Sequence, residues 1–355
     1  MSNSLRKTMT QHCAFDNKPA KLIELTNDAG MSITLMDIGA TWLSCRIPIN
    51  NATGRAEREV LLGGSTLQDY MQNSSYMGAT IGRYANRINK GQFKINGISY
   101  QTSVNQSGNT LHGGQSGFDS QRWIIESQHD NQVRFSLLSI DGDQGFPGNL
   151  HVFVTYFLNQ NNGVEISYQA STDKATPVNL CNHAYVNLMG EQSKQDCRSH
   201  FLEINADHYL PTDKFGIPID ELTSVAETSF DFRAEKLISE AFLADEQQLI
   251  AKGYDHSFYL KQNRSDSEYA AKLIAADHSV CMKVYTDKPA IQLYTGNYLA
   301  GEKNKTGGVY SNYAGVALES QFLPDSPNHP EWNQASCILR PGHKYNYKTS
   351  YTFEF

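Results

Sequence analysis

The sequence predicts an all-β protein, a large and mostly antiparallel β-sandwich with a few short helices. Two observations support this prediction. Tyr, Phe and Gly are abundant, with 19, 16 and 26 copies among 355 residues, and this composition favours strands joined by tight turns. Strand periodicity also recurs along the chain, whereas helical periodicity is confined to short stretches.

Strand patterns are clearest in four segments, at residues 93–100, 150–158, 164–172 and 347–355. The first segment alternates apolar and polar residues on both sides of Asn96-Gly97. This dipeptide favours a type I′ hairpin turn, because both central residues of that turn need positive φ. We therefore expect an antiparallel hairpin here.

Helical patterns occur in two places. Residues 66–72 predict a short helix with Thr66 near its N-cap. Residues 234–252 contain strong helix formers of mixed periodicity, and Gly253 stands where a C-cap would. Two short helices cannot form the core. Because the sequence contains no repeat or linker, residues 1–355 are predicted to form a single domain.

Charge and hydropathy exclude several classes of partner. The formal net charge is −7, so there is no basic surplus to neutralise a nucleic-acid backbone. Arg6 and Lys7 are not followed by the apolar segment of a signal peptide, and no apolar run could span a membrane. The six cysteines are scattered, which predicts reduced, buried thiols. Together these features predict a cytoplasmic protein. A monomer and a homodimer are both compatible with the sequence.

Motifs for covalent and metal catalysis are incomplete. The segment around Ser116 is close to a nucleophile elbow, but Phe118 occupies the position that requires Gly. Asp141-Gly142-Asp143 begins like a calcium loop, yet Val152 replaces the Glu at its twelfth position. The histidines have no metal-ligand spacing, so we predict neither a metal nor a cofactor.

Polar residues gather instead within five apolar or glycine-rich segments, at residues 82–88, 109–114, 179–188, 253–260 and 315–325. Glu319 follows an apolar run, where a carboxylate must be paired, neutral or functional. His183 lies in what reads as an apolar strand, and its imidazole could exchange a proton near neutral pH. A salt-bridged Glu and a hydrogen-bonded core histidine are the alternative interpretations.

The other segments contribute groups that could bind hydroxyls. His112 precedes two glycines, which would let a ligand approach closely, although it could equally be a loop histidine. Arg87 and Asp255 could bind hydroxyls or form a structural ion pair with each other. No nucleophile has a base beside it in sequence. The set suits proton transfer on a neutral polyol, with Glu319 and His183 as the working pair.

These segments resemble the aldose 1-epimerase family, also called the galactose mutarotases, over nearly the whole chain. The shared motifs occur in the family's order: GRYANRI, NTLHGG, DGDQGFPG, NHAYVNL, DHYLPTD, GYDHSFYL, IQLYTGNYL and ALESQFLPDSPN. Val186 is a departure, because the family usually has an aromatic residue there. The resemblance implies the family's large β-sandwich, the galactose mutarotase-like supersandwich. It also implies interconversion of the α and β anomers of a free hexose such as D-galactose or D-glucose, without a cofactor.

Site roles follow from the same resemblance. Glu319 resembles the base that takes the proton from the C1 hydroxyl, and His183 the acid that protonates the ring oxygen. We expect the two groups on opposite sides of the sugar ring. His112 resembles a second histidine near the ring oxygen. The residues that resemble hydroxyl-binding groups are Asn86, Arg87, Tyr185, Asp255 and Gln292.

Three other functions remain as alternatives. A glycosidase would normally need two carboxyl groups, for which Glu319 and Asp255 are the candidates. An epimerase of hexose 6-phosphates would need additional cationic residues for the phosphate. A non-catalytic sugar-binding protein could keep Arg87 and Asp255, but would not need Glu319 and His183 together.

Overall fold

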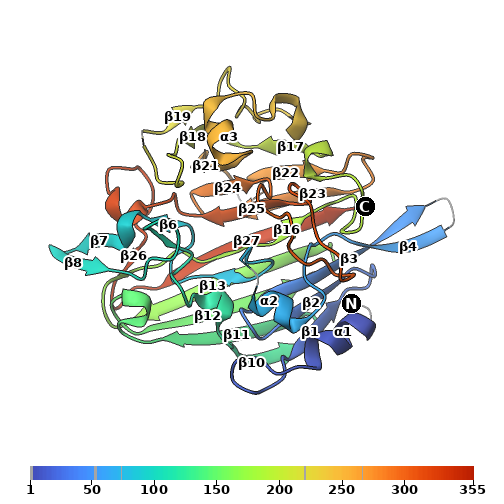
Figure 1. Ribbon diagram of the computed structural model, residues 1–355, viewed down its shortest axis with the longest axis horizontal. Coiled ribbons are helices and arrows are strands. Elements are labelled where there is room, and N and C mark those ends of the chain that lie inside the picture. The colour runs from blue at the N-terminus through green and yellow to red at the C-terminus, as the bar shows by residue number, and fades with distance from the viewer. Residues whose placement is uncertain (1–2, 52–53, 73, 220, 266) are drawn as a thin grey trace.

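The computed structural model describes residues 3–51, 54–72, 74–219, 221–265 and 267–355 (Figure 1). Strands dominate these residues and pair antiparallel with their neighbours within every sheet. None of the helices in this part of the chain is both long and apolar enough to cross a bilayer. The predicted all-β architecture is confirmed.

The largest sheet within the described ranges has nine strands, and long strands form its middle (Figure 1). In spatial order they are β10 (Ile124–His129), β11 (Gln132–Ser139), β12 (Leu150–Leu158), β13 (Gly163–Thr172), β27 (Tyr345–Glu354), β23 (Cys281–Thr286), β22 (Ala271–Ile274), β17 (Phe201–Ile204) and β20 (Lys236–Leu237). Burial alternates along β12, so one face of this sheet packs on the core.

A second sheet, six-stranded among the described residues, carries the candidate site. Its order is β16 (Tyr185–Val186), β25 (Val316–Gln321), β24 (Ala290–Tyr294), β21 (Asp255–Leu260), β18 (Ala206–Leu210) and β19 (Thr223–Ser224). All six residues of β25 are buried, so both faces of this strand are covered. One face, with Val316 and Leu318, belongs to the main hydrophobic core. The opposite face, which includes Glu319, is therefore available for a buried site.

Shorter sheets complete the sandwich. One contains β1 (Leu22–Thr26), β2 (Ser32–Met36), β3 (Thr41–Asn51) and β4 (Gly54–Glu59). The remaining strands form pairs: β5 (Thr80–Ile81) with β15 (Cys181–Asn182), β6 (Arg87–Ile88) with β9 (Thr110–Leu111), β7 (Gln92–Ile95) with β8 (Ile98–Gln101), and β14 (Thr176–Pro177) with β26 (Ile338–Leu339). The rings of Trp42 in β3 and Tyr351 in β27 lie 5.6 Å apart, so the main core extends across separate sheets.

The helices are short, as predicted. Thr66 caps α2 (Leu67–Met71) through a capping box with Asp69. The segment 234–252 forms the short strand β20, a 3₁₀ turn at Ile238–Ala241 and α3 (Glu246–Ala251) rather than one helix. Lys252, not the predicted Gly253, is the left-handed residue that ends α3. Gly253 is needed for another reason, since a β-carbon there would collide with the side chains of Asn297 and Thr295.

Two further predictions were incomplete. The helix α1 (Asn3–Thr10) was not anticipated from the sequence. All six cysteines are free, as expected, but Cys13 is exposed and Cys281 only partly buried. The other strand predictions hold. Asn96 and Gly97 both have positive φ in the β7–β8 turn.

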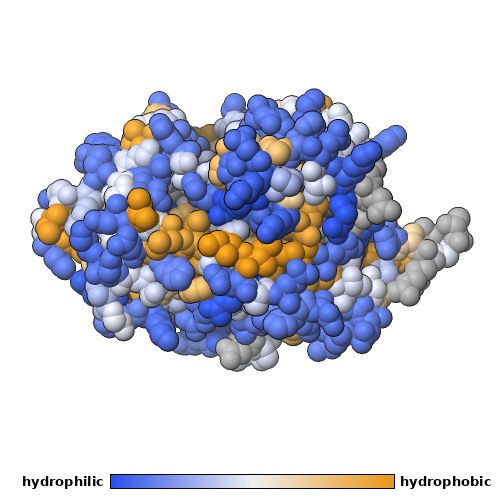
Figure 2. All heavy atoms as spheres, turned by 90° about the horizontal axis from the view of Figure 1, so that it is seen from below, coloured by the Kyte–Doolittle hydropathy of each residue, from blue (hydrophilic) through white to orange (hydrophobic). Residues whose placement is uncertain are grey.

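One face of the molecule carries an apolar feature that a space-filling view makes clear. Figure 2 shows the molecule from below, with apolar side chains gathered in a band across an otherwise polar face. Large apolar side chains also remain exposed on two strands of the nine-stranded sheet, Ile124 on β10 and Leu138 on β11. Neither Ile124 nor Leu138 lines the pocket described next.

Candidate active site

The central groups of the site lie in two adjacent rows of the six-stranded sheet, each row being a set of residues paired across neighbouring strands. Tyr185 pairs with Ala317, Ala317 with Tyr294, and Tyr294 with Asp255. In the neighbouring row, Glu319 pairs with Gln292. Directly paired residues project from the same face of a sheet, as do residues two apart on one strand. Residues far apart in sequence therefore face one space.

That space is a pocket of about 460 Å³, a size typical of small-molecule sites. Seven of the eight predicted site residues line it: Asn86, Arg87, His112, His183, Tyr185, Asp255 and Glu319. Gln292 is the exception. It lies behind the pocket, where its Nε2 donates to Asp255 Oδ1 at 2.7 Å and its Oε1 accepts from Gln321 at 3.3 Å. Gln292 thus holds the Asp255 carboxylate rather than lining the cavity.

Glu319 and His183 meet at the buried end of the pocket. Glu319 Oε1 lies 3.5 Å from His183 Nε2, and the two side chains are only 3% and 5% exposed. This distance exceeds a normal N–H···O hydrogen bond. Burial raises the pKa of Glu319 above its usual range, although His183 opposes the rise. The buried carboxyl is therefore easier to protonate than an exposed one.

The two groups are adjacent, which corrects the expectation that they lie on opposite sides of a sugar ring. His183 also lies outside regular strand structure, in the two-residue break between β15 and β16, rather than within a strand as its apolar neighbours suggested. Its Nδ1 has no hydrogen-bond partner among the described residues. No hydrogen bond to Nδ1 from these residues therefore fixes which nitrogen of the His183 ring carries the proton.

His112 has its tautomer set by the backbone. The N–H of Asn86 donates to His112 Nδ1 at 3.1 Å, which leaves the ring proton on Nε2. Burial, with smaller contributions from His183 and Arg87, lowers the pKa of His112 well below its usual value, so the ring stays neutral. His112 thus offers an N–H donor beside His183, with ring centroids 5.3 Å apart.

This tautomer bears on metal binding. Ligand atoms of His112, His183 and Glu319 lie within 4.8 Å of one another, which is a possible metal-binding group. A histidine that binds a metal normally donates its second ring N–H to a protein acceptor. His112 does the reverse, because its second nitrogen accepts a bond from a backbone N–H. The arrangement favours hydrogen-bond donation over coordination.

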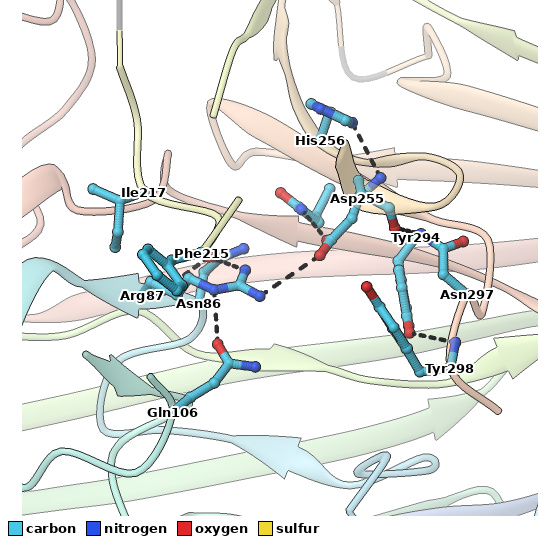
Figure 3. A network of polar contacts seen from close by, with 12 residues as sticks. Asn86, Arg87, Gln106, Phe215, Ile217, Asp255, His256, Tyr294, Asn297 and Tyr298 are labelled. Carbon is cyan, nitrogen blue, oxygen red and sulfur yellow. Dashed lines mark hydrogen bonds and ion pairs between the residues drawn. The ribbon is translucent and has the colours of Figure 1, made fainter. Parts of the chain in front are cut away.

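Arg87 and Asp255 face each other across the pocket wall (Figure 3). Arg87 Nη2 lies 3.6 Å from Asp255 Oδ2, and Arg87 Nε donates to Gln106 Oε1 at 2.9 Å. The two residues are thus an ion pair, as the alternative interpretation held, and both still line the pocket. Their side chains are 12% and 23% exposed, so each keeps surface for a ligand.

A sequence model of the aldose 1-epimerase family matches residues 21–352 of this chain. The chain belongs to the aldose 1-epimerase family. It is therefore an enzyme, an isomerase that acts on carbohydrate by interconverting aldose anomers.

Relatives of known name agree over almost the whole length. The aldose 1-epimerase of Escherichia coli K12 is 50% identical over 97% of this chain and 98% of its own. The galactose mutarotase of Homo sapiens is 40% identical over 86% of this chain and 87% of its own.

Solved structures give the same result. A GalM/aldose epimerase homologue from C. elegans superposes with a TM-score of 0.85 at 28% identity, covering 94% of this chain and 99% of its own. Galactose 1-epimerase from Lactobacillus acidophilus gives 0.81 at 30% identity, covering 97% of each chain. The predicted galactose mutarotase-like fold is confirmed.

Several pocket residues of this aldose 1-epimerase family member were not predicted. The ring of Tyr76 packs edge-on against His112, with centroids 4.7 Å apart. Phe215 and Tyr298 line the outer part and are 42% and 57% exposed. Phe215 lies two residues after the quoted motif DHYLPTD, and Tyr298 lies within IQLYTGNYL, but neither position is marked by charge in the sequence. Only the folded loops bring them to the pocket.

Proposed function

We propose that Glu319 is the base and His183 the acid that open and reclose the ring of a free hexose at C1. The supporting observation is the adjacency of Oε1 and Nε2, 3.5 Å apart at the buried end of a polar pocket. The two oxygens that exchange protons in mutarotation, O1 and the ring oxygen, are both bonded to C1. Neighbouring protein groups, rather than groups on opposite faces, can therefore serve both.

In the opening step, the Glu319 carboxylate accepts the proton of the C1 hydroxyl while His183 donates a proton to the ring oxygen. The electron pair on O1 forms the C=O bond as the bond from C1 to the ring oxygen breaks. Rotation about C1–C2 then presents the other face of the aldehyde. On reclosure His183 takes the proton from the attacking hydroxyl and Glu319 returns one to O1, so no atom is gained or lost.

The burial of Glu319 and of His112 supports the proposed proton transfers. The raised pKa of Glu319 makes its conjugate acid easy to form, which a base that must later return the proton requires. His112 stays neutral and donates from Nε2, so it can stabilise charge that develops near the ring oxygen without adding a second cation. The pocket thus offers one base, one acid and one fixed donor.

Hydroxyl binding is assigned to the remaining wall. Arg87 and Asp255 present opposite charges on one side, and Asn86 and Tyr185 add an amide and a phenol. We assign Gln292 a supporting role, because it contacts Asp255 from behind. The names of the relatives refer to aldose and to galactose, and we propose a free hexose of this kind as the substrate.

Two further statements belong to this proposal. The protein acts on its monosaccharide as a monomer or a homodimer, since one chain already forms the pocket. We also propose a cytoplasmic location, which the six free thiols support, because disulfides are rare in reducing compartments.

The test is polarimetry on freshly dissolved α-D-galactose and α-D-glucose. The purified protein should speed the approach to anomeric equilibrium in proportion to its concentration. Glucose 6-phosphate and an aryl glycoside, assayed in parallel, separate a phosphosugar epimerase and a glycosidase from the proposed enzyme. No acceleration with any free hexose would refute the proposal.

A further inference from the structure

The two carboxylate oxygens of Glu319 have different surroundings. Oε1 faces His183 Nε2 at 3.5 Å, on the pocket side. Oε2 lies 3.5 Å from Cys181 Sγ, within the range of a hydrogen bond to sulfur, and both residues are buried. Cys181 does not line the pocket. The base is therefore contacted on one oxygen by the acid and on the other by a thiol.

Cys181 is held firmly in this place. It belongs to β15, pairs with Ile81 of β5, and is 1% exposed within a small cluster of Ala79, Ile81 and Ala85. Burial first, and then the nearby charge of Glu319, raises the pKa of this thiol well above its usual value. The S–H therefore keeps its proton and can only donate toward the carboxylate.

We propose that Cys181 is a positioning residue for Glu319: its thiol donates to Oε2 and leaves Oε1 as the oxygen that exchanges protons with the sugar. This inference rests on the proposed role of Glu319. A thiol is a weak donor, so it orients the carboxylate with little loss of its basicity. Without the donor the carboxylate would be free to turn, and its ionised form would lose a stabilising contact.

The experiment compares Cys181→Ala with Cys181→Ser in the full chain, by polarimetry across the acidic pH range. Both substitutions remove the sulfur and leave nearly the same space, but only Ser keeps a donor. Cys197→Ala is the matched control. Its buried thiol contacts the carbonyl of Thr295 at 3.6 Å and does not line the pocket.

The acidic limb of kcat/KM reports the protonation of Glu319 in the free enzyme. Charged or titratable groups with an electrostatic or close contact to Glu319 are His112, His183, Arg87, Asp255, Cys181, Tyr185 and Tyr351. Cys181→Ala and Cys181→Ser leave all of them except the thiol unchanged. A shift that differs between these two variants therefore comes from the donor itself.

Cys181→Ala should lower kcat/KM about tenfold and move the acidic limb upward by roughly half a pH unit. Cys181→Ser should keep the limb at or below its wild-type position and recover most of the rate, and Cys197→Ala should match wild type. Coincident pH profiles for the Ala and Ser variants would overturn the inference. Wild-type activity in Glu319→Gln would instead overturn the proposed function, so the two failures are distinguishable.

Discussion

Two buried clusters, each built around ionisable groups, lie close together in the fold, since Cys181 is near both Glu319 and Lys288, but they differ in what they face. One is the pocket triad, which consists of His112, His183 and Glu319. The other surrounds Lys288, which precedes β24 and is 1% exposed. Its ammonium lies 4.5, 4.4 and 4.1 Å from the ring centres of Phe322, Tyr345 and Tyr347.

The Lys288 cluster is closed. Its ammonium donates to the Tyr345 hydroxyl, which also accepts the backbone N–H of Leu180, and neither side chain lines the pocket. The triad is open, because each of its three members lines the pocket. Burial shifts pKa values in both clusters. A shifted pKa therefore marks a candidate site only when the group also faces a cavity.

The largest expected effect is a difference in kcat between a substitution in the pocket triad and one in the Lys288 cluster. Glu319→Gln removes the base but keeps its shape, and kcat should fall about 10³-fold. Lys288→Met should keep kcat within about threefold, because this side chain does not reach the pocket. Polarimetry with matched protein concentrations measures both. Equal losses in the two variants would mean that the open and closed clusters are not functionally distinct.

Folding of Glu319→Gln is checked by thermal unfolding at neutral pH. Burial raises the pKa of Glu319 in the folded state, so the ionised carboxylate destabilises the fold at pH values above that pKa. Removing the charge should leave the midpoint unchanged or raise it. A lowered midpoint would show that the loss of activity comes partly from unfolding.

His183→Asn tests the other half of the pair. The amide keeps a hydrogen-bond donor but cannot transfer a proton, so kcat should fall about 10²-fold, less than in Glu319→Gln. The pH dependence gives a second readout. Because Glu319 must be ionised to act, the rate of wild type should fall as pH drops through the raised pKa of this carboxyl. An unchanged kcat in His183→Asn would refute the proposal that His183 is the acid.

Local patterns predicted the strands well because strand periodicity needs no knowledge of distant residues. Residues 150–158 form β12 with the predicted bounds, and positive φ at Asn96 and Gly97 matches the predicted hairpin. His183 shows the limit of this approach. Its apolar neighbours resemble a strand, yet His183 lies between two short strands, β15, which pairs with β5, and β16, which pairs with β25.

The site was predictable only in part. Motif resemblance identified seven residues that line the pocket, but it also placed Gln292 there, and periodicity cannot tell a lining residue from one behind it. The loop containing Phe215 was missed, because its position depends on packing against Arg87. Gly216 has positive φ, which glycine adopts without strain, and a β-carbon there would lie 2.5 Å from the Arg87 guanidinium carbon, so glycine suits this close approach.

A moderate effect on KM is expected from a substitution of Asp255 in the pocket wall. Asp255→Asn keeps the shape but removes one charge of the ion pair with Arg87 and weakens hydroxyl binding. KM should rise about tenfold with a smaller change in kcat, which is the pattern of lost ground-state binding. Initial rates at several sugar concentrations separate the two constants. Gln292→Ala should show a weaker version of the same change, because it only supports Asp255.

The smallest expected effect concerns the closed cluster and appears in stability rather than in activity. Burial lowers the pKa of Lys288 to about 7, whereas an unfolded lysine titrates near its usual 10.5. Between these values the unfolded chain binds one more proton, so the free energy of unfolding should rise with pH. From pH 7.5 to 8.5 wild type should gain about 1 kcal/mol relative to Lys288→Met. Urea unfolding of both proteins at the two pH values measures this difference, since titrations that they share cancel. If the free energy of unfolding has the same pH dependence in wild type and Lys288→Met, Lys288 stays charged in the folded protein, and the three aromatic rings stabilise its ammonium.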